Sequence, residues 1–236
     1  MPKLPEKYSI SFVLPMYNEV QNIERTVATL KGIASEIAGD HEIVIVDDGS
    51  TDGCGGLVES LAQKDPAIRL FSLERNTKFG GAFAKGFMSA RKDIIVYMDS
   101  DLPVSVDDIK RSLPFIETAD IVTGYSSIKK GDTLKRKIMS TVYNAMVQVM
   151  FGLNVKDINS GYKIVRRSML EGIRFISQSP FVDVELFLQA KRKKAAVKQF
   201  ALLFHPRSGG KSYMGRLPII WATFRDMFKV RFSYLR

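Results

Sequence analysis

The first half of the chain alternates short apolar runs with stretches whose apolar residues recur at helical spacing. The apolar runs are bounded by polar or turn-forming residues, and Ile43-Val44-Ile45-Val46 is apolar throughout, as in a strand buried on both faces. Strands alternating with helices predict an α/β fold with a mostly parallel central sheet and helices on both faces. The expected strands are residues 10–14, 42–46, 68–73 and 94–98, and the expected helices are residues 19–37, 54–63 and 81–90.

The second half is less regular, and neither an internal repeat nor a low-complexity tract divides it. No apolar run reaches the roughly 18 residues that a membrane-spanning helix requires, so we expect no such helix. We expect one domain over residues 1–215, followed by a basic amphipathic helix over residues 216–236. The strands expected in this half are residues 120–124, 162–165 and 197–204, and the helices are residues 134–151, 183–190 and 217–235.

Polar and acidic residues follow three of the expected strands. In open sheets with parallel strands, ligands bind beyond the carboxyl ends of the strands. Acids gathered there repel one another unless a cation or a ligand compensates, although acids and hydroxyls also cap helices. Three such strand ends together favour a binding site. They are Leu14-Pro15-Met16-Tyr17-Asn18-Glu19, Asp47-Asp48-Gly49-Ser50-Thr51-Asp52 and Asp99-Ser100-Asp101.

The pair Asp99 and Asp101 is the sharpest of these signals. Two carboxylates one residue apart after a buried strand can share a hard divalent cation, and Mg²⁺ or Mn²⁺ prefers oxygen ligands. Mg²⁺ is commonly held by one or two carboxylates together with substrate phosphates, so a diphosphate would complete its coordination. The alternative is a polar loop with two solvated acids, because Asp-x-Asp occurs often by chance.

Two further turns are candidates for contacts with a nucleotide. Asp47 or Asp48 can accept hydrogen bonds from a base or ribose, while Gly49 permits a tight turn. Capping of the next helix is the alternative, and both roles can coexist. In Arg75-Asn76-Thr77-Lys78-Phe79-Gly80-Gly81, the glycines would let a nucleotide approach the backbone, although the segment is neither G-x-G-x-x-G nor a P-loop.

Positive charge is concentrated at the C-terminal end. The formal net charge is +10, and residues 191–236 contain 12 Lys and Arg against the single acid Asp226, which leaves 23 basic and 24 acidic residues in residues 1–190. This asymmetry indicates a polyanionic partner such as nucleic acid, anionic lipid or a phosphate ligand, with a solvated basic surface as the alternative. No recognised nucleic-acid-reading motif accompanies the charge, so we expect no nucleic-acid partner.

Seven segments of the chain carry a family resemblance. Those of the first half are Pro15-x-Tyr17-Asn18-Glu19, Asp47-Asp48-Gly49-Ser50-x-Asp52, Asn76 with Gly80-Gly81, and Asp99-x-Asp101. Together they resemble the family 2 glycosyltransferases of the GT-A fold. Those of the second half are Asp157-x-x-Ser160-Gly161-Tyr162-Lys163, Asp183-Val184-Glu185-Leu186 and Arg207-x-x-Gly210-x-Ser212. They resemble polyprenyl- and dolichyl-phosphate sugar transferases, and most of all the dolichyl-phosphate β-glucosyltransferase type.

The resemblance implies roles for particular residues. Asp99 and Asp101 would hold Mg²⁺ or Mn²⁺ on the donor diphosphate, so Asp101 would take part in catalysis. Apart from the resemblance, Asp157, Asp183 and Glu185 are the remaining acids of interest, and of these we expect Asp157 to orient the sugar or act as a base. Either Asp47 or Asp48 would recognise the base. The nucleoside pocket would be lined by Pro15, Tyr17 and Glu19, with Asn76, Gly80 and Asp99 also at the nucleotide, and the phosphates would meet Arg136, Lys163 and Arg207.

The implied reaction is the transfer of glucose from UDP-glucose to polyprenyl or dolichyl phosphate, with inversion at the anomeric carbon. A polyprenyl monophosphate is mostly dianionic at neutral pH, because its second pKa lies near about 6, so it needs positive charge more than a general base. The alternatives are transfer of mannose from GDP-mannose, and transfer to a glycan hydroxyl by a soluble enzyme, which would need a base.

The expected C-terminal helix carries basic and aromatic side chains on different sides. This arrangement is typical of a helix that lies in a membrane interface, and packing of the apolar side on the sheet is the alternative. Cys54, the only cysteine, fits a reducing compartment. We therefore expect a peripheral enzyme in the cytoplasm, at the cytoplasmic face of a membrane. The basic side carries Arg225, Lys229 and Arg236, and the apolar side carries Leu217, Trp221, Phe224, Phe228 and Leu235.

Overall fold

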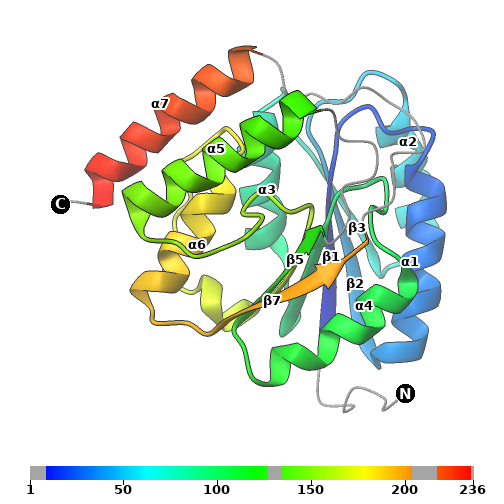
Figure 1. The fold of residues 1–236 in the computed structure, drawn as a ribbon. Coiled ribbons are helices and arrows are strands. Elements are labelled where there is room, and N and C mark those ends of the chain that lie inside the picture. Colours follow the sequence, from blue (N-terminus) through cyan, green and yellow to red (C-terminus); the bar gives the residue numbers. More distant parts are fainter. Residues whose placement is uncertain (1–8, 127–133, 204–216, 235–236) are drawn as a thin grey trace.

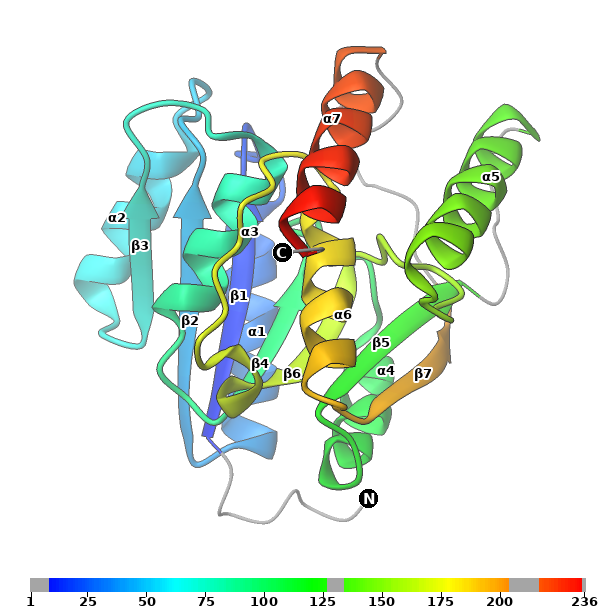
Figure 2. The same cartoon turned by 90° about the vertical axis from the view of Figure 1, so that its left-hand side faces the viewer.

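A single sheet with helices on both faces forms the molecule (Figures 1 and 2). The computed structural model describes residues 9–126, 134–203 and 217–234, except for the side chains of residues 134–137 and 234. Within these segments, seven strands follow the order β3-β2-β1-β4-β6-β5-β7. Their bounds are β1 (Ser9–Met16), β2 (Asp40–Asp47), β3 (Ile68–Ser72), β4 (Ile94–Met98), β5 (Ile121–Ser126), β6 (Tyr162–Arg166) and β7 (Val197–Leu202).

The strand directions bring the predicted site segments to one edge of the sheet. β1 pairs in parallel with β2 and with β4, and β2 pairs in parallel with β3, so the carboxyl ends of these four strands lie at the same edge. β7 is parallel to β5, whereas β6 runs antiparallel between β4 and β5. Tyr162 at the start of β6 therefore lies beside Met98 at the end of β4. The predicted α/β fold with a mostly parallel sheet is confirmed, and β6 is its antiparallel exception.

The helices form two layers. One face of the sheet is covered by α1 (Ile23–Ile37), α2 (Cys54–Lys64), α4 (Val106–Ser112) and the 3₁₀ helix η1 (Leu113–Glu117). The other face is covered by α3 (Lys78–Ser89), α5 (Leu134–Phe151), the 3₁₀ helix η2 (Arg167–Leu170), α6 (Val182–Arg192) and α7 (Leu217–Tyr234). In Figure 2, α5 and α7 rise on the side toward which the parallel strands point.

Alternation along the strands divides the apolar core into two parts. In β1, Phe12 points to the α1 face and Val13 to the α3 face, and both are fully buried. On the α3 face, the rings of Phe83 and Phe87 stack with centroids 4.3 Å apart, and Tyr97 of β4 lies 4.9 Å from Phe83. Such aromatic contacts add to the free energy gained by burial, so they hold α3 firmly against the centre of the sheet.

Two expectations about helices differ from the structure. The first helix begins at Ile23 and not at residue 19, because residues 20–22 form a turn in which the Asn22 N–H donates to the Glu19 carbonyl at 3.0 Å. Helix α4 was not expected, although Ser105 caps it by accepting the Asp108 N–H at 3.0 Å. Among the described helices, none combines the length and the hydrophobicity that crossing a membrane requires.

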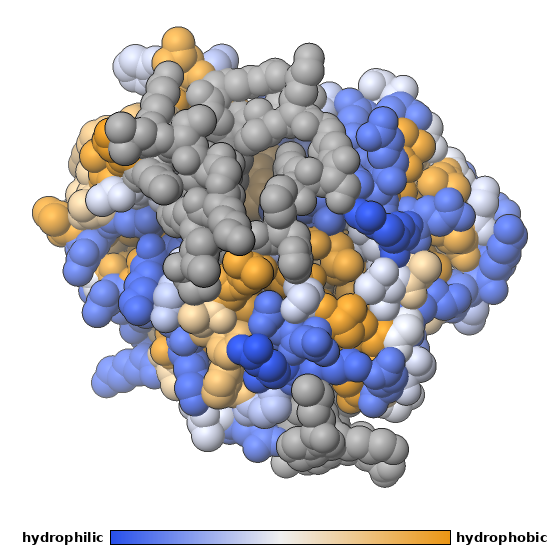
Figure 3. Space-filling view, turned by 45° about the vertical axis from the view of Figure 1, so that its right-hand side comes forward, coloured by the Kyte–Doolittle hydropathy of each residue, from blue (hydrophilic) through white to orange (hydrophobic). Residues whose placement is uncertain are grey.

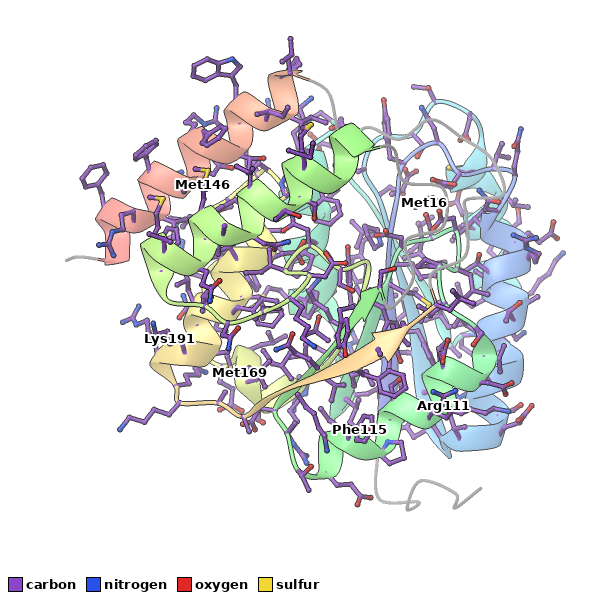
Figure 4. The ribbon with its side chains drawn as sticks, in the orientation of Figure 1. Met16, Arg111, Phe115, Met146, Met169 and Lys191 are labelled. Atoms are coloured by element: carbon purple, nitrogen blue, oxygen red, sulfur yellow. The ribbon has the colours of Figure 1, made fainter. Side chains whose placement is uncertain are left out.

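The basic run that begins at Lys191 is partly used inside the fold. The Lys191 ammonium donates to the carbonyls of Phe151 at 2.8 Å and Gly152 at 3.2 Å, so it caps the C-terminal end of α5. Lys198 lies 4.3 Å from the ring centroid of Phe115. Lys191 and Phe115 are labelled in Figure 4. Part of the positive charge therefore stabilises tertiary contacts.

Candidate active site

The loops after β1 and β2 hold each other through side-chain hydrogen bonds. Asn18 has a left-handed backbone with φ 56°, which asparagine tolerates better than most residues. Its N–H donates to Ser50 Oγ at 3.0 Å, and its Oδ1 accepts the Thr51 N–H at 2.8 Å. Asp52 Oδ2 accepts the Val20 N–H at 2.9 Å. These two strand ends therefore form one rigid corner before any ligand is considered.

Asp47 and Asp48, which the sequence leaves as alternatives, have different neighbours. Asp47 Oδ1 accepts the Ser50 N–H at 2.9 Å, and its Oδ2 occupies the space that a side chain at Gly55 of α2 would need. Asp47 also lines a hollow of about 650 Å³ between α2 and β3, at the β3 edge of the sheet. The strands β2 and β1 lie between β3 and β4, so this hollow is not the site that Asp99 and Asp101 define.

Asp48 instead faces α3 and the turn before it. Its Oδ1 accepts the Thr77 N–H at 2.6 Å and the Thr77 hydroxyl at 2.7 Å. Burial raises the pKa of Asp48, and the two bonds from Thr77 act in the opposite direction. Among the described residues, neither Asp47 nor Asp48 receives a hydrogen bond on Oδ2. The structure thus brings Asp48, and not Asp47, together with the predicted turn at Asn76.

Another part of this chain packs against Gly80, which explains the absence of a side chain at this position in a way that the sequence analysis did not predict. A Cβ atom there would lie 2.4 Å from the Ser177 carbonyl oxygen, and the Gly80 N–H donates to the Gln178 carbonyl at 2.9 Å. Its missing side chain therefore admits another part of this chain. Gly81 leaves room for Thr77, since a Cβ at Gly81 would lie 2.2 Å from Thr77 Oγ1. The glycines thus allow close packing around Thr77, which bonds to Asp48, and the predicted approach of a nucleotide to their backbone stays a prediction.

Asp99 and Asp101 lie on a tight turn directly after β4. The Leu102 N–H donates to the Asp99 carbonyl at 3.2 Å, and Leu102 has φ 51°. The Asp99 N–H donates to the Gly161 carbonyl at 3.2 Å, and its Oδ2 fills the space beside Gly161, where a Cβ would lie 2.5 Å away. Thr26 of α1 donates to the Ser100 carbonyl at 2.8 Å. The turn is therefore fixed by α1 on one side and by the start of β6 on the other.

The donor set on this turn fits a divalent cation that shares its ligands with a substrate. Asp101 is buried at 7% exposure, and Asp99 is half-buried, so the pair stands at the boundary between protein and solvent. Within the described segments, no group of three or more His, Cys, Asp or Glu side chains gathers to bind a metal. Two carboxylates are what a Mg²⁺ or Mn²⁺ site needs when substrate phosphates supply the remaining oxygens.

Lys163, predicted to contact phosphate, lies inside the protein. It is fully buried on β6, with its ammonium 2.7 Å from Asp183 Oδ1 of α6, bonded to the Ser160 carbonyl and 5.6 Å from the ring centroid of Tyr97. The alternation of β6 causes this position, because Tyr162 and Ile164 face the α1 side while Lys163 points toward α6. We therefore correct the assignment: the position of Lys163 supports an internal ion pair and not a contact with substrate phosphate.

Asp157 belongs to the surroundings of this ion pair. Burial raises the pKa of Asp183 to about 6, Lys163 acts to lower it, and the charge of Asp157 adds to the rise. Tyr97 is also part of the group, since burial and the charges of Asp99 and Asp183 raise the pKa of its hydroxyl. The charge of the predicted residue Asp157 thus acts on the buried Asp183, and the charges of Asp99 and Asp183 act on Tyr97.

The remaining predicted residues fall into two groups. Pro15 lies on β1 opposite Val46, Tyr17 is half-buried after the strand, and Glu19 accepts the Asn22 side-chain amide at 2.8 Å. Their contacts with a nucleotide stay predictions. Arg207 lies outside the described residues, and so does the side chain of Arg136 in the first turn of α5.

Sequence reasoning missed Thr77, which ties Asp48 to α3. The signal was present, because threonine directly before a helix is a common capping residue. Its side chain bonds the Asp48 carboxylate of a neighbouring strand end instead of its own helix.

Comparison with known proteins places the chain in a family. Residues 11–174 match the family described as Glycosyl transferase family 2, and the chain belongs to this family of glycosyltransferases. Its fold is shared with solved glycosyltransferase structures. Glucosyl-3-phosphoglycerate synthase from Mycobacterium tuberculosis in complex with phosphoglyceric acid has a TM-score of 0.71 at 20% identity, covering 96% of this chain and 80% of that one. The same enzyme with Mn²⁺, UDP-glucose and phosphoglyceric acid gives 0.69 at 19% identity, covering 93% and 79%.

Curated relatives are named for transfer to polyprenyl phosphates. The undecaprenyl-phosphate mannosyltransferase of Micrococcus luteus is 28% identical over 214 residues, covering 86% of each chain. The polyprenol monophosphomannose synthase of Mycolicibacterium smegmatis is 27% identical over 226 residues, covering 90% of this chain and 83% of the relative. The undecaprenyl-phosphate 4-deoxy-4-formamido-L-arabinose transferase of Photorhabdus laumondii is 30% identical over 181 residues, covering 74% of this chain and 54% of the relative.

Proposed function

We propose that this glycosyltransferase moves a hexose from a nucleotide diphosphate sugar to a polyprenyl or dolichyl phosphate. The observation that carries the proposal is the turn of Asp99 and Asp101, which lies at the sheet edge shared with Asp48 and is fixed from two sides. Two relatives that match this chain over most of their length are named for transfer to polyprenyl phosphates, which supports the choice of acceptor.

Two donors are candidates. UDP-glucose is the first, because the segment Asp183-Val184-Glu185-Leu186 resembles the dolichyl-phosphate β-glucosyltransferase type. GDP-mannose is the second, because the relatives from Micrococcus luteus and Mycolicibacterium smegmatis are named for mannosyl transfer. Asp48 is the residue that we assign to the base, since among the described residues only its Oδ1 accepts hydrogen bonds, both from Thr77.

The site residues account for an inverting displacement. Asp99 and Asp101 would hold Mg²⁺ or Mn²⁺, which supplies positive charge to the diphosphate leaving group. An oxygen of the acceptor phosphate forms a bond to the anomeric carbon while the bond to the donor diphosphate breaks, and the diphosphate takes the electron pair. The dianionic acceptor needs no general base, so Asp157 orients the sugar in this reaction. For a glycan hydroxyl, Asp157 would instead have to accept a proton.

The outer faces of α5 and α7 support contact with a membrane. Met227 and Val230 of α7 are fully buried, so one side of this helix packs on the domain. Its other side exposes Trp221 at 75% and Phe232 at 66%. In the view of Figure 3, hydrophobic and hydrophilic residues are interspersed on the surface that is coloured by hydropathy. Aromatic and basic side chains together are what an interfacial helix uses. The large apolar side chains exposed on the two helices are Ile138, Val142, Val149, Leu217, Trp221, Phe228 and Phe232.

The proposed orientation brings the active site and the lipid to the same side. α5 and α7 rise beyond the carboxyl ends of the parallel strands, where Asp48 and Asp99 lie (Figure 2). A polyprenyl phosphate whose chain stays in the bilayer can therefore present its phosphate to this edge. We propose that the protein acts as a peripheral enzyme at the cytoplasmic face of a membrane.

A transfer assay tests the proposed function. The purified protein is incubated with Mn²⁺ and either labelled UDP-glucose or labelled GDP-mannose, and each donor is offered polyprenyl phosphate in vesicles or a soluble glycan. We expect label in the lipid fraction from one of the two donors, and none in the glycan. Label in the glycan alone supports the hydroxyl-acceptor alternative, and label in neither product overturns the proposal.

A further inference from the structure

A segment without helix or strand runs along α3 before α6 begins (Figure 2). We name residues 175–180 of this segment the strap. Phe175 at its start packs on α3, with its ring centroid 5.7 Å from that of Phe83. The strap ends at Pro180, two residues before α6. Because it forms no ladder of its own, its backbone groups need partners elsewhere.

Two buried carboxylates supply those partners. Glu185 of α6 accepts the Ile176 N–H on Oε1 at 2.8 Å and the Ser177 N–H on Oε2 at 3.0 Å. Asp226 of α7 accepts the next two N–H groups of the strap on its Oδ2, from Gln178 at 3.0 Å and from Ser179 at 2.9 Å. Four consecutive amides of the strap are thus held by one acid from each of two helices.

We name Glu185 and Asp226 the clamp, and both of these acids are buried inside the fold. Glu185 is 1% exposed and Asp226 is 2% exposed. Burial raises the pKa of Glu185, while the amides of Ile176 and Ser177 act to lower it. Asp226 is the only acid in residues 191–236, and Arg225 lies 3.2 Å from its Oδ1. Hydrogen bonds from amides to a carboxylate are among the strong ones, so this single acid in a basic helix has a specific partner.

The strap in turn holds the first turn of α3. The Gln178 carbonyl accepts the Gly80 N–H at 2.9 Å. Gly80 approaches so closely that a Cβ would lie 2.7 Å from the Gln178 carbonyl carbon. Backbone therefore packs directly on backbone here, and a shift of the strap must shift the start of α3.

The first turn of α3 reaches the nucleotide site through Thr77. Thr77 precedes Gly80 by three residues and donates both its N–H and its hydroxyl to Asp48 Oδ1. Hydrogen bonds thus lead from Asp226 on α7 through the strap to Gly80, the backbone at the start of α3 connects Gly80 to Thr77, and Thr77 bonds to Asp48 at the tip of β2.

We propose that Asp226 and Glu185 are positioning residues for the nucleotide site, acting through the strap on Thr77 and Asp48. This inference rests on the proposed function, which assigns Asp48 to the donor base. Neither acid touches the donor. The two acids determine the position of the Asp48 side chain before the nucleotide binds. They therefore affect the affinity for the donor more than the rate of the transfer.

A purely architectural clamp makes a different prediction. It would lower the melting temperature when removed, but the molecules that remain folded would bind the donor as before. A positioning clamp changes the Kd and the KM for the donor while the kcat at saturating donor and the KM for the lipid phosphate stay the same. The separation of these constants is therefore the decisive readout.

The test uses Asp226→Ala and Asp226→Asn in the full chain. Asp120→Asn is the matched control, because its carboxylate also accepts a backbone N–H, that of Ala196 at 2.8 Å, but lies before β5 at the opposite edge of the sheet. We expect the Kd and KM for the sugar nucleotide to rise about tenfold in Asp226→Ala, equivalent to about 1.4 kcal/mol. Asp226→Asn keeps one acceptor oxygen and should lose less. The Asp120 control should bind as the wild type does.

The outcomes separate the two proposals. Wild-type protein that binds no sugar nucleotide overturns the proposed function and this inference with it. Wild-type protein that binds, together with a folded Asp226→Ala variant of equal affinity, overturns only the inference. An equal loss of affinity in Asp120→Asn also overturns it, because the effect would then be general.

A second measurement applies if the Asp226 variants do not fold. Hydrogen exchange of the wild type is followed with and without the nucleotide that the wild type binds. Positioning through the strap predicts slower exchange of the amides of residues 80 and 176–179 in the nucleotide complex, and no change at Ala196. Unchanged exchange in the strap overturns the inference.

Discussion

Carboxylates serve opposite purposes at the strand tips and in helices α6 and α7. At the tips of β2 and β4, the acids lie at the edge of the sheet where folds of this kind bind ligands; Thr77 holds Asp48, and a tight turn holds Asp99. In the helices, Asp183, Glu185 and Asp226 are at most 2% exposed; Asp183 forms an ion pair with Lys163, and amides of the strap donate to the other two. The comparison teaches that residue type alone does not identify a site residue, because the partners inside the fold decide its role.

Lys163 gives the strongest way to test this contrast. Lys163→Met removes the cation beside Asp183 and leaves a buried acid without its ion pair. We expect the free energy of unfolding in urea to fall by about 3–5 kcal/mol. The double variant Lys163→Met with Asp183→Leu should regain most of that loss. A variant of unchanged stability but with weak donor binding would restore the phosphate role and contradict our correction.

Asp101 tests the other side of the contrast. Asp101→Asn keeps the shape of the side chain but removes a negative charge from the proposed metal site. We expect kcat/KM for sugar transfer to fall by roughly 10²–10³-fold with little change in melting temperature. Asp107→Asn, at an exposed position in the first turn of α4, is the control and should transfer as the wild type does. Full turnover by Asp101→Asn would remove the role that we assign.

The pKa of Asp183 predicts a pH dependence of stability. The pKa is raised in the folded protein from its ordinary value of 3.8 to about 6, so the folded state binds this proton more tightly than the unfolded state. The stabilisation is complete below pH 3.8 and is lost as the pH rises through 6. Unfolding in urea at several pH values should show that the stability of the wild type relative to Asp183→Asn declines between about pH 4 and pH 6. A constant difference would contradict the raised pKa.

The exposed aromatic residues of α7 give the smallest of the expected effects. Trp221→Ser or Phe228→Ser removes apolar area from the proposed membrane face without touching the buried side of the helix. We expect binding to vesicles that contain anionic lipid to weaken by about tenfold for each change, as measured by sedimentation. Met88→Ser on α3, which removes another exposed apolar side chain, is the control. Equal loss in the control would show that the contact is not specific to α7.

The sequence predicted the parallel part of the sheet well because its signals are local. The apolar run at residues 94–98 and the acids that follow it are neighbours in the chain, so periodicity and spacing place Asp99 at a strand tip. The confirmed family and fold rest on several such segments in a fixed order.

The roles of the buried residues could not be predicted in the same way because these roles depend on contacts between residues far apart in the sequence. Whether Lys163 faces solvent or α6 is decided by the register of an antiparallel strand between β4 and β5. Whether Asp226 is a surface acid or a clamp is decided by the strap, which lies 47 and 48 positions earlier in the chain. Gly80 is similar, since the atoms that exclude a side chain there belong to residues about 100 positions away.

The most direct test of the central claim is donor binding to the strand-tip carboxylates. The melting temperature of the wild type and of Asp99→Asn with Asp101→Asn is measured with UDP-glucose and GDP-mannose, each with and without Mn²⁺. A ligand that binds only the native state raises the melting temperature. We predict that one donor stabilises the wild type, that Mn²⁺ strengthens the effect, and that the double variant loses the Mn²⁺-dependent part. A wild type that responds to neither donor, or a double variant that responds as fully as the wild type, would contradict the account.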